Sequence, residues 1–139
     1  MTARWVVDEV APERDLDINW RSISLFNKND ADVDSPYFAT HKLLRVFEAV
    51  KASEGRDASQ ALYWEYGRRQ HHDGDRDVTP REFLEGAGLD VGYADAADDG
   101  DTWDHVIQSE MDAGLELAGN DIGTPIIAFD NADGDRVAY

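Results

Sequence analysis

The chain has 139 residues, a length typical of one domain, and 42% of them are hydrophobic, which is enough to bury a core and excludes disorder throughout. Its 30 acidic and 13 basic residues give a formal net charge of −17, so its surface field repels nucleic-acid phosphates and anionic lipid headgroups. The sequence contains no cysteine, and therefore no disulfide, no thiolate metal ligand and no thiol nucleophile.

Membrane insertion and secretion are not indicated. The sequence has no apolar stretch of the roughly 20 residues that a bilayer crossing needs, and no basic start followed by an apolar signal core. We therefore expect a cytoplasmic protein with no membrane or nucleic-acid partner. Its acidic residues are spread over several segments, such as 30–34 and 95–101, which favours a solubility or high-salt adaptation over a docking surface for a basic partner.

The first 25 residues predict a helix followed by a strand. Residues 2–10 have helical periodicity without a capping residue before the first turn, and Pro12 with the polar stretch 12–15 is expected to end this helix. Residues 16–25 alternate apolar and polar side chains, which is the period of a strand. A helix followed by a strand is the last part of a β-α-β unit, so we expect that the strand preceding the helix is missing. Met1 is then expected to be an internal methionine or a fragment boundary.

Residues 35–118 predict an all-helical block. One helix begins at Ser35 and Pro36 and closes at Gly55, and a second follows from Asp57. A third helix is indicated by a capping box of Thr79, Pro80 and Glu82. After a loop at 95–101, apolar residues at helical spacing over 102–118 predict a fourth.

The chain then returns to strands, with an apolar run at 125–129, a polar turn at 130–135 and a second strand from 136. The predicted organisation is a partial sheet layer, formed by residues 1–34 and 119–139, that is interrupted by a helical insertion at 35–118.

Gly123, Thr124 and Pro125 lie immediately before the apolar run at 125–129. X–Pro bonds are the only peptide bonds for which the cis isomer is inexpensive, and the tripeptide alone leaves both isomers open. A cis bond would turn the backbone sharply and present the N–H and C=O groups of Thr124 to a groove. A peptide or thiol ligand could pair with them there as an added strand.

This order of elements resembles the DsbA-like branch of the thioredoxin superfamily, and within it the actinobacterial enzymes described as mycothiol-dependent reductases or nitroreductases. Residues 4–25 are similar to the family's stretch from active-site helix into second strand. Residues 67–74 are similar to its helical segment with Gly67, His71 and Gly74, and residues 118–131 to its cis-proline loop and third strand. The resemblance implies an α/β, DsbA-like thioredoxin fold, incomplete at both ends, with a cis Thr124–Pro125 bond.

The resemblance implies thiol-disulfide or thiol-dependent reduction of a small-molecule thiol or disulfide substrate, with mycothiol or glutathione as the thiol of the parent family. Gly123, Thr124 and Pro125 would shape the substrate groove, and His71 would face it from the helical lid. His71 could equally interact with the last carbonyls of its helix. The family's Cys-x-x-Cys, or its Ser or single-Cys variant, would precede Met1. We therefore assign no catalytic residue and no bound cofactor, and expect the chain as given to be inactive.

Two other functions stay open, a thiol transferase or isomerase of the kappa type and a noncatalytic binding module. Whether the chain is an enzyme is therefore undecided at this point. In a thioredoxin arrangement the missing strand is central, so both its neighbours would expose unpaired backbone groups. We expect a folded chain to form a homo-oligomer.

Other motifs predict no further chemistry. His71 and His72 point about 100° apart on a helix and cannot easily share one ion, so no metal site is assigned. No Ser-His-Asp signature, phosphate loop or zinc signature is evident. The four tryptophans are expected in the core or in the wall of a groove.

Overall fold

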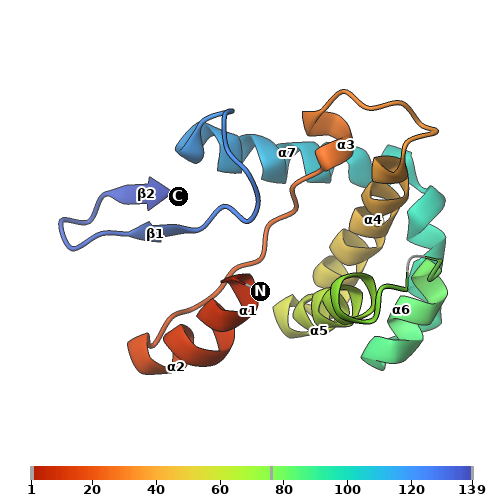
Figure 1. The fold of residues 1–139 in the computed structure, drawn as a ribbon, viewed down its shortest axis with the longest axis horizontal. Helices are drawn as coiled ribbons and strands as arrows, with labels where there is room; N and C mark the ends of the chain where they lie inside the picture. The colour runs from red at the N-terminus through yellow and green to blue at the C-terminus, as the bar shows by residue number, and fades with distance from the viewer. Residues whose placement is uncertain (1, 76, 139) are drawn as a thin grey trace. The chain divides into compact units, whose positions relative to one another are not determined.

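The computed structural model describes residues 2–75 and 77–138, and most of them are helical (Figure 1). The chain divides into two compact units. Unit 1 comprises residues 1–21 and 112–139, and unit 2 comprises residues 22–111. The two strands assigned within the described residues form one antiparallel hairpin in unit 1, so the chain is a mixed α/β protein with a small sheet.

The N-terminal helix of unit 1 passes through Pro12 instead of ending there. It consists of α1 (Thr2–Trp5), a π-helical turn η1 (Val6–Val10) and α2 (Ala11–Arg14). In η1 the N–H of Ala11 bonds the carbonyl of Val6, five residues back. A proline normally breaks a helix because it lacks the N–H for the i−4 bond and clashes with that carbonyl. The wider π turn ahead of Pro12 removes this conflict, and the helix ends at Asp15, which has a φ of 52°.

The strand predicted over 16–25 is wrong. Residues 16–24 form neither helix nor strand, although Ile18 and Trp20 are partly buried, as the alternation suggested. An extended segment becomes a strand only when its backbone pairs with a neighbour, and the strands assigned among the described residues pair only with each other. A short helix α3 (Leu25–Lys28) follows, capped by the Ser24 hydroxyl, which accepts a 3.1 Å hydrogen bond from the Asn27 N–H.

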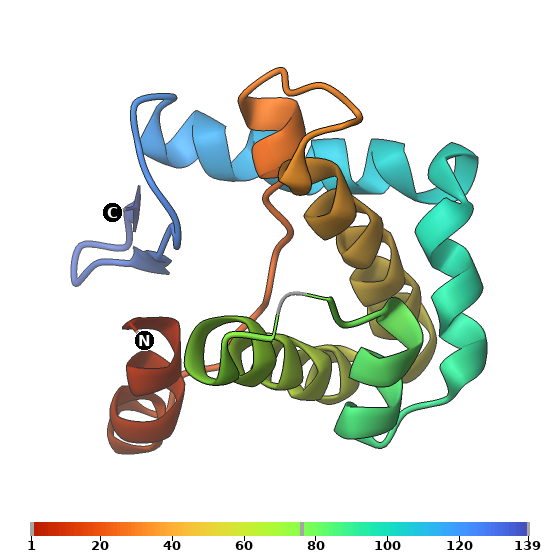
Figure 2. The ribbon, with the colours of Figure 1, turned by 45° about the vertical axis from the view of Figure 1, so that its right-hand side comes forward.

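Unit 2 is helical, as its sequence predicted. Helix α4 packs on α5 and η3, and α6 packs on α5 and η3 (Figures 1 and 2). Its elements are α4 (Pro36–Glu54), α5 (Arg56–Gly67), π-helical η2 (Arg68–Asp73), α6 (Pro80–Ala87), the 3-10 segment η3 (Val91–Asp98) and the first part of α7 (Gly100–Ala118).

Only one of the predicted capping signals forms the predicted side-chain cap. The capping box of α6 is complete, because Thr79 and Glu82 each bond the other's backbone N–H. Ser35 occupies the N-cap of α4 without a side-chain cap bond. The loop expected at 95–101 is mostly absent, because η3 continues to Asp98 and α7 begins at Gly100. Asp99 caps this start by accepting the Thr102 N–H at 3.1 Å.

The core lies in unit 2. Every buried residue among those described belongs to residues 22–111. Burying each large apolar side chain contributes about 1.5–3 kcal/mol, and the most enclosed of them are Val46, Val50, Leu62, Leu84 and Ile107. Trp5 is 59% exposed, so the expectation that all four tryptophans line a core or groove is wrong for this one. Its exposure follows from its place on a helix of unit 1, because none of the described residues of that unit is buried.

The predicted hairpin is confirmed, although its strands are short. β1 (Ala128–Asp130) pairs with β2 (Arg136–Ala138) in the register Phe129↔Val137. The Asn131 side chain organises the turn by accepting the N–H groups of Asp133 and Asp135. The strand thus begins at Ala128, and the residues between Pro125 and β1 form no ladder.

Candidate functional site

The loop of Gly123, Thr124 and Pro125 is exposed in unit 1. The Thr124–Pro125 peptide bond is cis, the isomer predicted from the sequence. No backbone hydrogen bond engages Thr124 within the described residues. After the loop, the Ile126 side chain lies against α7, where a Cβ on Gly114 would be 3.5 Å from Ile126 Cδ1. The backbone groups of Thr124 thus lie close in sequence to Ile126, whose side chain packs against α7.

His71 lies on η2 of unit 2 and is exposed. Its ring meets Tyr66 edge-on, with ring centroids 5.9 Å apart. It makes no hydrogen bond to the helix-end carbonyls among the described residues, because the Arg69 carbonyl accepts from the Gly74 and Asp75 N–H groups instead. The structure thus groups three of the four predicted site residues in one loop of unit 1, whereas His71 belongs to unit 2.

Glu65 anchors the start of η2. Its carboxylate accepts hydrogen bonds from Arg68 at 2.8 and 3.0 Å and from Arg69 at 2.5 Å. The bond from Arg68 is the main cause that lowers the Glu65 pKa to about 2, against the opposing effect of burial. The same carboxylate occupies space above Gly86 of α6, where a Cβ would come within 2.1 Å of Glu65 Oε1. Glu65 therefore joins α5, η2 and α6.

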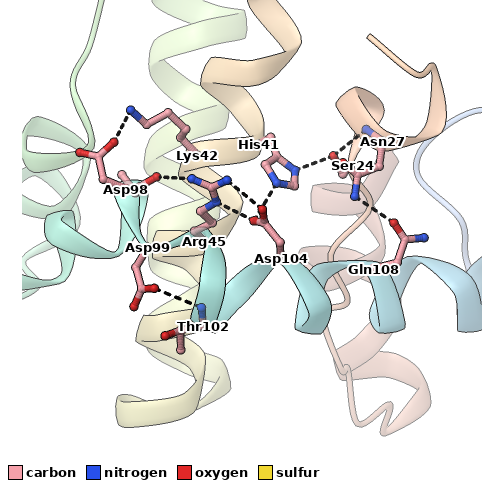
Figure 3. Close-up of polar contacts among 11 residues, drawn as sticks. Ser24, Asn27, His41, Lys42, Arg45, Asp98, Asp99, Thr102, Asp104 and Gln108 are labelled. Carbon is pink, nitrogen blue, oxygen red and sulfur yellow. Dashed lines mark hydrogen bonds and ion pairs between the residues drawn. The ribbon is translucent and has the colours of Figure 1, made fainter. Parts of the chain in front are cut away.

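A chain of polar contacts in unit 2 connects Ser24, His41 and Asp104 (Figure 3). Ser24 Oγ lies 2.8 Å from His41 Nδ1, and His41 Nε2 lies 2.9 Å from Asp104 Oδ1. An ionised Asp104 can only accept, so Nε2 carries a proton. Nδ1 of a neutral ring then accepts from the Ser24 hydroxyl, while Ser24 Oγ accepts from the Asn27 N–H. This assignment satisfies every group in the chain of contacts.

The three residues form a serine–histidine–aspartate arrangement that was not evident from the sequence. Such an arrangement supports nucleophilic catalysis when the serine is accessible. Here Ser24 is 0% exposed and His41 only 2% exposed, so a substrate cannot reach Oγ. The arrangement instead holds the start of α3 against α4 and α7.

Arg45 extends this network to η3. It donates two hydrogen bonds to Asp104, at 2.6 and 2.9 Å, and one to the Ala97 carbonyl at 2.9 Å. Burial opposes ionisation of Asp104, but the bonds from Arg45 and His41 outweigh it and hold the Asp104 pKa below its ordinary value. One carboxylate thus fixes two buried basic side chains of α4.

One sequence signal could have revealed the network. His41, Arg45 and Glu48 follow one another at four- and three-residue spacing, so they share one face of α4 with the apolar core residues. Polar residues on a buried face need partners from other elements. The identity of those partners, Ser24 and Asp104, had no local signal because they lie 17 and 63 residues from His41.

Neither a metal centre nor a membrane-spanning helix is evident in the described part of the chain. No group of three or more histidine, aspartate or glutamate side chains there is arranged to hold a metal ion. Among the helices of the described part, none combines the length and the apolar character needed to cross a bilayer.

Residues 1–135 match the family described as mycothiol-dependent nitroreductase Rv2466c. The chain belongs to this family. The match covers nearly all of the 139 residues, and it confirms the resemblance that the sequence showed to mycothiol-dependent nitroreductases. The family is one of thiol-dependent oxidoreductases, and its description implies a low-molecular-weight thiol as reaction partner.

This member of the mycothiol-dependent nitroreductase family contains no cysteine in its 139 residues. Thiol chemistry requires a thiolate as nucleophile, and neither a thioether nor a buried serine replaces it.

Proposed function

We propose that this chain is the ligand-binding part of a DsbA-like, thioredoxin-type oxidoreductase, in which Gly123, Thr124 and Pro125 receive a low-molecular-weight thiol or its disulfide. The family match over residues 1–135 carries the proposal. The exposed loop and the unengaged backbone of Thr124 support it.

Binding would use the backbone rather than a side chain. The Thr124 N–H donates to a carbonyl of the ligand and the Thr124 C=O accepts an amide N–H of the ligand, as in the addition of a strand. Mycothiol and glutathione both carry amide groups that can make this pair. This mode of binding does not require the Thr124 side chain.

The redox step needs a nucleophile that these residues do not contain. A thiolate attacks one sulfur of a disulfide, a mixed disulfide forms and the second sulfur leaves as a thiolate. We therefore propose that the 139-residue chain binds its ligand without turnover. In this form it is a noncatalytic binding module of an oxidoreductase family.

The binding proposal can be tested by two-dimensional amide NMR of the full chain, titrated with glutathione disulfide and with mycothiol disulfide. We expect saturable shifts of the Thr124 amide and its neighbours. Thr124→Ala should bind as the native chain does, whereas Thr124→Pro removes the N–H and should abolish binding, with unchanged circular dichroism in both. Recognition through the backbone would be refuted if Thr124→Ala lost binding. It would also be refuted if the ligand shifted only amide signals outside the Thr124 loop.

The absence of turnover can be tested separately by insulin reduction with dithiothreitol, with and without the chain. The rate should equal that of the blank. A faster rate would show that the chain has a nucleophile that we have not identified. Conjugation of glutathione to 1-chloro-2,4-dinitrobenzene above the blank would instead favour the transferase alternative.

A further inference from the structure

An open cavity of about 440 Å³ lies within unit 2, between α4, the junction of α5 and η2, the start of α6, and η3. Pockets that bind small organic molecules typically have volumes of roughly 300–1,000 Å³. Its apolar wall includes Leu43 and the rings of Tyr66 and Phe83, whose centroids are 5.7 Å apart. The cavity can therefore accept an apolar or aromatic group.

Three hydrogen-bond donors line this cavity without a hydrogen bond in the described part of the chain. They are the Tyr66 hydroxyl, the Gln70 amide and the Arg81 guanidinium, which come from α5, η2 and α6. The carboxylate on the wall is already engaged, because Asp98 pairs with Lys42 at 2.5 Å. A ligand that brings acceptor oxygens would meet donors that no group of the described residues engages.

The charges around the cavity favour an anion. Lys42 and Arg81 line it together with Asp98, in a chain whose net charge is −17. The carboxylate of Glu82, next to Arg81, is bonded to the N–H and hydroxyl of Thr79. Asp98 is 79% exposed at its side chain, so water screens its pair with Lys42. Because Lys42 and Asp98 compensate each other, Arg81 is the cation of the wall that an anionic ligand would meet.

The π-helical segment η2 provides an independent indication. Such segments are rare and occur often at functional sites, because the extra residue in the turn changes where the following side chains point. Gln70 belongs to η2 and lines the cavity, while His71 of the same segment contacts the cavity residue Tyr66. The irregular backbone thus coincides with the cavity wall.

We propose that this cavity is a second binding site, specific for a small aromatic carboxylate. The ring would lie against Leu43, Tyr66 and Phe83, and the carboxylate would accept from Arg81, with Lys42 and Gln70 within the same wall. The proposal does not depend on the thiol site of unit 1, because every residue it uses belongs to unit 2.

The test is a titration of the full chain with 3-phenylpropionate, in which two-dimensional amide NMR spectra are recorded at each ligand concentration. Saturable shifts should appear at residues of the cavity wall, with a Kd on the order of 1 mM, a value reasonable for a ligand of this size. The neutral 3-phenylpropanamide should bind about tenfold more weakly, because a charge-assisted hydrogen bond to Arg81 is lost.

Three variants separate the site from general charge effects. Arg81→Gln should weaken binding of the acid about tenfold. Ala94→Phe should abolish it by filling the cavity. Arg14→Gln, which removes an exposed arginine of α2 instead, should leave it unchanged. Circular dichroism should show the native helix content in all three.

Three results would overturn the proposal. They are equal affinities for the acid and the amide, an unchanged affinity in Arg81→Gln, and an absence of saturable shifts up to about 10 mM probe, roughly ten times the expected Kd. The titrations with thiol disulfides probe the Thr124 loop, so the two proposals can fail separately.

Discussion

Replacing Asp104 by asparagine should be among the most destabilising single changes at a polar residue of unit 2. The Asp104 carboxylate accepts from His41 Nε2 and twice from Arg45, whose side chains are 2% and 9% exposed. An asparagine places an N–H₂ group against one of these donors and leaves the positive charge of Arg45 without a counterion. Removing one partner of a fully buried ion pair costs about 3–5 kcal/mol. Asp104 itself is 43% exposed at its side chain, so water can compensate in part, and we expect a loss of about 2–3 kcal/mol.

The loss can be measured by urea denaturation at neutral pH, followed by far-ultraviolet circular dichroism. Asp98→Asn is the matched control, because it removes a carboxylate of an exposed ion pair in the same unit and should leave the stability nearly unchanged. If the two variants differed by less than about 0.5 kcal/mol, Asp104 would not be the group that holds α4 to α7, and our assignment of the network would be wrong.

The remaining predictions concern Glu65 and unit 1. The Glu65 pKa is lowered from 4.5 to about 2, so this carboxylate stabilises the fold above about pH 4.5, and the stabilisation disappears as the pH falls towards 2. Glu65→Gln should therefore be about 1–2 kcal/mol less stable at pH 7, with the difference vanishing near pH 2, in urea titrations at several pH values. Gly86→Ala should lose about 1–2 kcal/mol because its Cβ meets Glu65, whereas Gly67→Ala, with nothing within 4 Å, should be neutral or slightly stabilised. Because the described part of unit 1 has no buried residue and exposes several large apolar side chains, we expect fast amide exchange in its hairpin and self-association at micromolar concentration. Slow exchange at residues 128–130, or a monomer by light scattering, would contradict these two expectations.

The sequence predicted those features that neighbouring residues determine. The capping box of Thr79 and Glu82 satisfies two backbone N–H groups within one turn, and Gly55 ends α4 with a φ of 90° that other residues rarely adopt. Asn131 and Gly134 likewise shape the hairpin turn with their own side chain and backbone. Such signals need no knowledge of the rest of the fold.

The features that failed depend on distant partners. The alternation at residues 16–25 is the pattern of a strand, but its realisation requires a neighbouring strand, and local sequence carries no information about that neighbour. The loop at Thr124 could be predicted because a proline is a local signal. The contact of His41 with Asp104 could not be predicted, because it joins residues 63 positions apart.

The division of the chain has a consequence for ligand binding. Among the described residues, those that are buried belong to unit 2, while the Thr124 loop belongs to unit 1, next to a hairpin of two short strands. An isolated hairpin of two strands is only marginally stable in water, so we expect the loop to be ordered for only part of the time. The apparent Kd of a ligand equals its intrinsic Kd divided by the fraction of the competent form. Under the proposed function, affinity at the Thr124 loop would therefore depend on the stability of unit 1, and a change that strengthens the hairpin should tighten thiol binding without contacting the thiol.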